Sequence, residues 1–155
     1  MKMQVLNTKG FSLIELVAVI VLISILAVAA TGRIGNFSGF ESRGFFDDTV
    51  AAMRYAQKLA ISTGCNVQFT ITAASYALVQ RDDCDTGAYT RNVLNPVDRT
   101  NPYTATAPAG ITISPTGAYI FSPQSPVAGP VSDTTFSIAG FQFILYQQTG
   151  LVDVL

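Results

Sequence analysis

The chain has 155 residues, of which 49% are hydrophobic and only 12% are charged, and its formal net charge is −1. It contains no histidine, so the usual general base near neutral pH and the commonest metal ligand are both missing. Its lysines and arginines are scattered singly, whereas nucleic-acid-binding proteins usually show clustered positive charge. These features argue against an enzyme and against nucleic-acid binding, and we expect no cofactor.

The N-terminal part of the chain is an apolar block over residues 11–30 that contains a single charge, Glu15. A helix over residues 11–32 would be roughly 33 Å long at about 1.5 Å per residue, which is enough to cross a hydrocarbon core of about 30 Å. Lys2 and Lys9 precede the block, and positive charges keep the preceding end in the cytoplasm. We therefore predict one membrane span, with the remainder of the chain exported.

An ordinary secretory signal peptide is the alternative reading of this block, because Ala27-Val28-Ala29 fits a small-residue cleavage site. The apolar run is longer than the roughly 7–15 residues usual for such a signal. Glu15 also lies inside it, where a carboxylate is costly and indicates a functional site. Both features favour an anchor that is retained.

Residues 9–16, with the sequence Lys-Gly-Phe-Ser-Leu-Ile-Glu-Leu, resemble the motif of type IV prepilins. The resemblance implies that a prepilin peptidase cuts after Gly10 and that the new N-terminal residue, Phe11, is N-methylated. Glu15 then becomes the fifth residue of the mature chain, a position that this family keeps acidic. The implied partners are other pilin subunits, the peptidase and an assembly platform in the inner membrane, before the subunit moves to a cell-surface pilus.

The chemistry of Glu15 agrees with this resemblance. A lone carboxylate in lipid needs a partner, and removal of the leader gives Phe11 a free, positively charged amine. Pairing of Glu15 with the Phe11 amine of a neighbouring subunit would set the axial register, because mispairing leaves a charge uncompensated. The sequence departs from the family at Gly32, where many pilins carry a proline. Together, Gly32 and Gly35 predict a weak point in the helix, because glycine is unfavourable in a helix interior.

A second helical stretch follows, and we expect residues 33–64 to continue the N-terminal helix. The apolar residues after residue 47 recur with a helical period. Asp47 or Asp48 could cap the amphipathic part of this stretch, and Gly64 is a suitable stop.

Residues 67–72 and 76–81 alternate as strands do and predict a hairpin. If Ala74 and Ser75 lie at the centre of the turn, the residue numbers of each facing pair add up to 149. This register sets Phe69 opposite Gln80, an imperfect pairing that a bulge or a longer turn would relieve.

Cys65 and Cys84 would face each other in that register, at a Cα separation of about 4.5–5.5 Å that suits a disulfide. Export to an oxidising compartment favours such a bond. A redox pair or a metal site is the competing interpretation, but the chain has neither a C-x-x-C motif nor a histidine. We predict a structural disulfide.

Three aspartates, Asp82, Asp83 and Asp85, flank the second cysteine. Carboxylate oxygens can hold calcium, although the spacing is not that of an EF-hand. A solvated acidic loop is the default interpretation of this cluster, and we expect no metal.

The remaining segments predict a β-rich head over residues 65–155. Residues 86–110 read as a long loop, and the later strands are expected over 111–114, 118–121, 134–138, 141–146 and 151–155. Together these elements predict an α+β fold, in which a long N-terminal helix with an apolar, transmembrane half packs on an antiparallel sheet or a small β-sandwich. The expected parts are a leader over residues 1–10, the membrane helix over 11–32, its continuation over 33–64 and this head.

Residues 56–67 resemble the H-type pseudopilin and FimT-like group, and Gly64-Cys65 with Cys84 looks closest to the C-type minor pilins of the mannose-sensitive haemagglutinin (MSHA) pilus. This resemblance implies a minor pilus subunit that helps to start or cap a filament used for surface attachment. A minor pseudopilin of type II secretion shares every feature above. A FimT-like DNA-uptake pilin is disfavoured by the lack of a basic patch, and a secreted domain behind a signal peptide is a further alternative.

Overall fold

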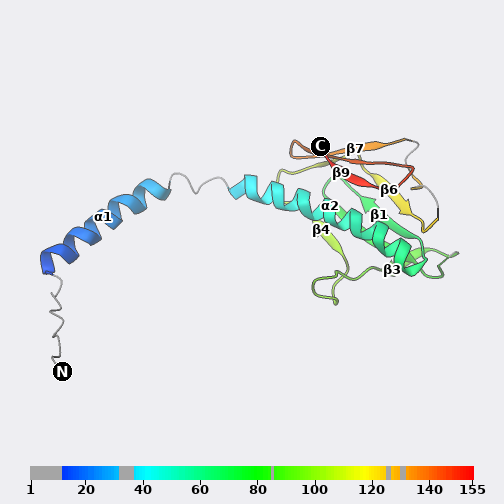
Figure 1. The fold of residues 1–155 in the computed structure, drawn as a ribbon, viewed down its shortest axis with the longest axis horizontal. Coiled ribbons are helices and arrows are strands. Elements are labelled where there is room, and N and C mark those ends of the chain that lie inside the picture. Colours follow the sequence, from blue (N-terminus) through cyan, green and yellow to red (C-terminus); the bar gives the residue numbers. More distant parts are fainter. Residues whose placement is uncertain (1–11, 32–36, 85, 125–126, 130–131) are drawn as a thin grey trace, which may run out of the picture. The chain divides into compact units, whose positions relative to one another are not determined.

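The computed structural model describes residues 12–31, 37–84, 86–124, 127–129 and 132–155. The chain divides into two units, Met1–Phe37 and Ser38–Leu155. The first contains the helix α1, Leu13–Thr31, and the second contains most of the helix α2, Phe37–Thr63, together with all the strands (Figure 1). Each unit is described by itself below.

The predicted membrane span over residues 11–32 has both of its ends outside the described residues. Among the residues that are described, no helix is both long enough and apolar enough to qualify as a membrane span. The predicted weak point at Gly32 and Gly35 also lies outside the described residues, as does the join between α1 and α2.

A five-stranded antiparallel sheet forms one layer of the head. Its strands follow the order β3-β2-β1-β6, and β4 also pairs with β2. The short β3 and β4 lie within the predicted long loop, so that part of the prediction was wrong. The strands are β1 Val67–Ile71, β2 Ser75–Arg81, β3 Tyr89–Asn92, β4 Thr104–Thr106 and β6 Gly117–Phe121.

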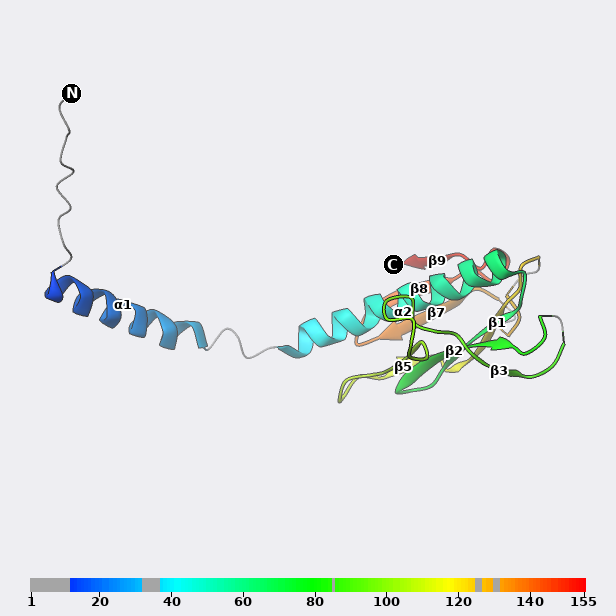
Figure 2. The same ribbon diagram turned by 90° about the horizontal axis from the view of Figure 1, so that it is seen from below.

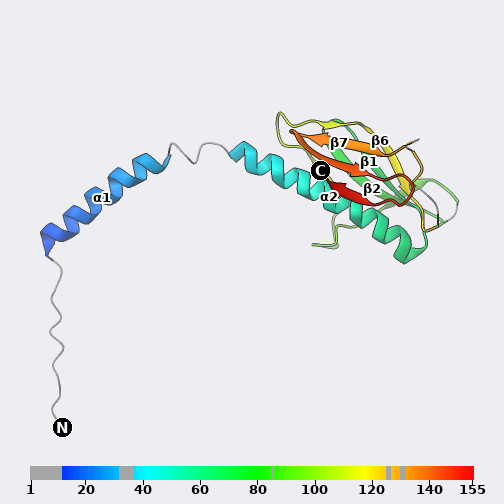
Figure 3. The same cartoon turned by 45° about the horizontal axis from the view of Figure 1, so that its top comes forward.

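A four-stranded antiparallel sheet forms the other layer, with the order β5-β7-β8-β9. Its strand β7 is labelled in Figure 3. In β7 and β8 buried and partly exposed side chains alternate, as they do when one face of a sheet covers a core. The strands are β5 Ile113–Ser114, β7 Thr134–Ile138, β8 Phe141–Leu145 and β9 Val152–Val154.

Helix α2 lies along one side of the strands and packs on both sheets (Figure 2). The buried Phe45 ring lies 6.1 Å from the ring of Tyr76 in β2, while the ring of Phe46 lies 5.8 Å from that of Phe143 in β8. The two sheets meet at Tyr119, whose ring is 5.1 Å from that of Phe136. A single hydrophobic core thus joins the helix and both sheets, which confirms the predicted α+β fold.

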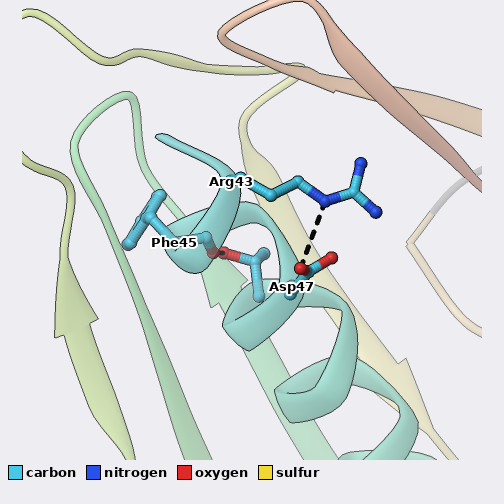
Figure 4. Close-up of polar contacts among 4 residues, drawn as sticks. Arg43, Phe45 and Asp47 are labelled. Atoms are coloured by element: carbon cyan, nitrogen blue, oxygen red, sulfur yellow. Dashed lines mark hydrogen bonds and ion pairs between the residues drawn. The ribbon is translucent and has the colours of Figure 1, made fainter. Parts of the chain in front are cut away.

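The N-terminal cap predicted for α2 was wrong, because Asp47 and Asp48 both lie inside the helix. Each carboxylate accepts a hydrogen bond from another side chain instead. Asp47 accepts a hydrogen bond from the Nε of Arg43 at 3.2 Å, one helical turn earlier (Figure 4). Asp48 accepts a hydrogen bond from the hydroxyl of Tyr76. The helix therefore begins before these residues, at Phe37.

The other end of α2 lies where the sequence predicts it. Gly64 follows the last helical residue with φ of 71°, a left-handed conformation that glycine adopts without steric cost. Its N–H donates to the carbonyl of Ala60 at 3.0 Å, as in a helix that ends on a left-handed residue. The chain can then enter β1 directly.

The hairpin of β1 and β2 has a different register from the predicted one. Phe69 faces Leu78, so the residue numbers of each facing pair add up to 147. The turn is therefore centred on Ala73-Ala74. Thr72 and Ser75 close this turn: the Thr72 N–H donates to the Ser75 carbonyl at 2.8 Å, and their hydroxyls are 2.8 Å apart. The observed register buries Phe69 and Leu78 together, which removes the poor match with Gln80.

The disulfide between Cys65 and Cys84 is present, with the two Cα atoms 4.3 Å apart. The hairpin register does not make these residues face each other. Beyond Arg81 the chain leaves the ladder, and this brings Cys84 back to the end of α2. The bond thus joins the helix end to the loop that follows β2.

Removal of the disulfide is expected to lower the stability of the head. Closing a loop of about 20 residues contributes roughly 3 kcal/mol in the chain-entropy model. The double variant Cys65→Ser with Cys84→Ser should therefore lose about that much free energy of unfolding. Urea denaturation followed by circular dichroism measures the loss, and reduction of the unchanged protein should reproduce it. A change within the error of the measurement would mean that the bond does not constrain the unfolded chain.

Candidate assembly site

Helix α1 presents apolar side chains on all of its faces. Every described side chain from residue 12 to residue 28 is exposed, including Leu13 at 80% and Val28 at 76%. A helix that is hydrophobic all round is stable when it is buried in a protein core or a membrane, and an exposed apolar surface of this kind marks an interaction site. We therefore take α1 as the candidate site.

The one polar residue in the middle of α1 does not interrupt this surface. The hydroxyl of Ser24 donates to the carbonyl of Ile20 at 2.7 Å, four residues earlier in the same helix. Its hydrogen-bonding capacity is thereby used within the helix, which lowers the cost of placing a hydroxyl in an apolar environment.

Glu15 occupies the first turn of α1, where the positive end of the helix dipole favours a carboxylate. Its backbone N–H donates to the carbonyl of Ser12 at 3.0 Å. The Ser12 hydroxyl oxygen in turn accepts from the N–H of Ile14 at 3.3 Å. These contacts make Ser12 the cap of the helix and put Glu15 at the position that an acidic residue takes in a capping box.

The capping role of Ser12 was not predicted from the sequence. The signal was present, because Ser12-x-x-Glu15 directly before an apolar run is the sequence pattern of a capping box. The cap fixes where the helix begins and hence places Glu15 in its first turn. Gly10 and Phe11, the predicted processing residues, lie outside the described residues.

The structure describes only part of the acidic loop after β2, so the expectation about calcium stays a prediction. Asp85 lies outside that part, and the described residues include no group of three or more side chains suited to a metal ion. Asp82 takes part in closing the loop: its carboxylate accepts from the hydroxyl of Thr90, and its N–H donates to the carbonyl of Ala88 at 3.1 Å.

Two tyrosines of the head that lie close to Asp48 of α2 have raised pKa values. Burial, reinforced by the hydrogen bond to Asp48, raises the pKa of Tyr76 far above its usual value. Burial and the nearby Asp48 and Tyr55 raise the pKa of Tyr103 to about 12. Both hydroxyls therefore stay protonated at neutral pH, and that of Tyr76 donates a hydrogen bond to Asp48.

Comparison with known proteins finds one family motif and two similar solved structures. Residues 6–31 match the prokaryotic N-terminal methylation motif. A crystal structure of the type IV minor pilin FimU from Pseudomonas aeruginosa superposes with a TM-score of 0.54 and 12% identity, over 77% of this chain and 91% of that one. A second crystal form of FimU gives a TM-score of 0.46 and 13% identity, over 70% and 88% of the two chains. No curated protein sequence matches the chain.

Proposed function

We propose that this protein, which combines the N-terminal methylation motif of type IV prepilins with the fold of a type IV minor pilin, is a minor structural subunit of a type IV pilus. The observation that carries the proposal is the exposed apolar surface of α1 with a single carboxylate, Glu15, in its first turn. Such a helix needs an apolar environment before assembly and an apolar partner after it.

In this proposal the chain is stored in the inner membrane with its N-terminus in the cytoplasm and its head in the periplasm. Prepilin peptidase cuts between Gly10 and Phe11, and Phe11 is methylated. The new amine then meets the Glu15 carboxylate of a neighbouring subunit, which sets the axial register as α1 moves from lipid into the filament core. The same apolar helix thus serves first as an anchor and then as an assembly surface.

We assign the filament to the MSHA type, on the arrangement of Gly64-Cys65 with Cys84, and the role to starting or capping assembly. Deletion should then reduce surface filaments and attachment while leaving type II secretion unchanged. Loss of secretion with filaments intact would instead indicate a minor pseudopilin, the alternative that shares the same N-terminal features.

The mature N-terminus tests the proposal most directly. Mass spectrometry of the protein purified from its own membranes should find Phe11 as the first residue, carrying one added methyl group. A strain without prepilin peptidase should keep Met1, which is the matched control. A mature chain that begins at Ala30, as after signal peptidase cleavage, would contradict the proposal.

A further inference from the structure

A groove of about 320 Å³ lies between α2 and the loop over residues 93–103. This volume is at the lower end of the range for small-ligand pockets, about 300–1,000 Å³. The groove therefore has room for one small ring. Its walls combine two cations, two tyrosines and two small apolar residues: Ala51, Arg54, Tyr55, Lys58, Pro96 and Tyr103.

The two cations of the groove are available to an anion. Arg54 and Lys58 are one turn apart on α2, and neither has an ion-pair partner among the residues that the structure describes. The Nε and Nη2 of Arg54 donate to the carbonyl of Val152 at 3.1 and 2.9 Å. This neutral acceptor fixes the guanidinium and leaves its charge uncompensated, while Lys58 is exposed.

The opposite wall is held in place by the backbone. The Tyr103 N–H donates to the carbonyl of Val93 at 2.7 Å, and the Asn95 N–H donates to that of Asn101 at 2.9 Å, so the loop is closed at its base. Tyr103 is buried and its ring lies 5.7 Å from the ring of Tyr55. A wall fixed in this way needs little reordering when a ligand binds, which lowers the cost of binding.

The nearest carboxylates on these two elements are already engaged. Asp48 on α2 accepts from Tyr76 and does not line the groove. Asp98 in the loop accepts from the N–H groups of Thr100 and Asn101 and from the Asn101 side chain, and these hydrogen bonds lower its pKa. An incoming anion would therefore meet two uncompensated cations and no carboxylate in the lining.

We propose that this groove binds a carboxylated sugar residue, with its carboxylate at Arg54 and Lys58 and its ring against the tyrosine and proline wall. An inorganic anion would use the cations alone and leave the rest of the groove empty. A neutral sugar would use the wall alone and leave the cations unpaired. A carboxylated ring uses both, because charge-assisted hydrogen bonds hold the carboxylate while amphipathic rings contact the sugar.

Titration of the mature full-length chain in detergent micelles tests this inference. With the tyrosine rings isotope-labelled, sodium D-glucuronate should produce saturable NMR shifts of Tyr55 and Tyr103. Glucose and sodium phosphate, added at the same concentrations, should produce much smaller shifts. Equal shifts with glucose, equal shifts with phosphate, or no shift with glucuronate would each overturn the proposal.

Two variants locate the binding in the groove. Lys58→Gln removes an exposed charge and should weaken glucuronate binding about tenfold or more, the usual effect of losing a charge-assisted hydrogen bond. Arg99→Gln removes one positive charge from the loop outside the groove and should leave binding unchanged. Equal effects of the two variants would indicate nonspecific attraction and overturn the assignment.

A further variant blocks the space without changing the charge. Ala51→Leu, at an exposed position of α2, should reduce binding while the circular dichroism spectrum stays unchanged; unaltered binding would place the ligand elsewhere. The inference does not rest on pilus assembly. If glucuronate did not bind, the prediction that the mature chain begins at Phe11 would be unaffected. If the mature chain began elsewhere, the prediction of glucuronate binding would likewise be unaffected.

Discussion

Replacement of Gly10 by valine is expected to abolish maturation, with the leader still attached to the accumulated chain. On the proposed function, the peptidase cuts the bond after Gly10, where a residue without a side chain allows close approach of the backbone. A branched side chain at that position displaces the bond from the catalytic groups, and a misplacement of about 1 Å costs roughly 100-fold in rate. Immunoblots and mass spectrometry of membranes should therefore show only precursor, and none of this subunit should reach filaments.

The matched control introduces the same side chain two residues earlier. Thr8→Val leaves Gly10 and Phe11 unchanged and should be processed normally. If Gly10→Val also matured at the normal rate, the peptidase assignment would be wrong. If both variants failed, the effect would come from poor membrane insertion, which protease accessibility of the head in spheroplasts would show independently.

Local chemistry made several features of the head predictable. Gly64 ends α2 because its positive φ suits a left-handed cap, and this requires nothing from the rest of the chain. Alternation of apolar residues located β1 and β2, because burying one face of a sheet demands it. The disulfide was correctly predicted from the position of both cysteines at the ends of this hairpin, although the register used to pair them was wrong.

The features that were missed depend on contacts between distant segments. Strands β3 and β4 are short and largely exposed, so they carry no alternation of apolar residues. They form by pairing with β2, which the sequence cannot show. The start of α2 was missed for another reason: Asp47 and Asp48 have the chemistry of caps, but Arg43 of the same helix and Tyr76 of β2 engage their side chains.

The apolar part of the assembly site was predictable because its character is entirely local. A block of branched apolar residues predicts the helix, whereas the role of Glu15 stays a prediction. The cap at Ser12 was overlooked because its hydroxyl was read only as part of a cleavage motif. The groove beside α2 could not be foreseen, since Arg54 and Tyr103 meet there only through the closed loop over residues 93–103.

Replacement of Glu15 by valine is expected to separate maturation from assembly. The variant keeps Gly10 and Phe11 and has a more apolar α1, so insertion and cleavage should proceed normally. Its neighbours would then hold an N-terminal amine without a partner in the filament core. Leaving one member of a buried ion pair uncompensated costs about 3–5 kcal/mol. The amount of this subunit in sheared filaments, relative to the membrane pool, should therefore fall by at least about tenfold.

Two companion variants decide whether charge is the cause. Ile14→Val introduces the same side chain at the adjacent position but keeps the carboxylate, so its incorporation should be normal. Glu15→Gln keeps the shape and removes the charge, so it should fail nearly as badly as Glu15→Val. Normal incorporation of Glu15→Gln would mean that side-chain shape, not pairing with the Phe11 amine, sets the register. Because all three chains should carry the same processed N-terminus, any difference between them arises after cleavage, at the step where α1 leaves the membrane for the filament.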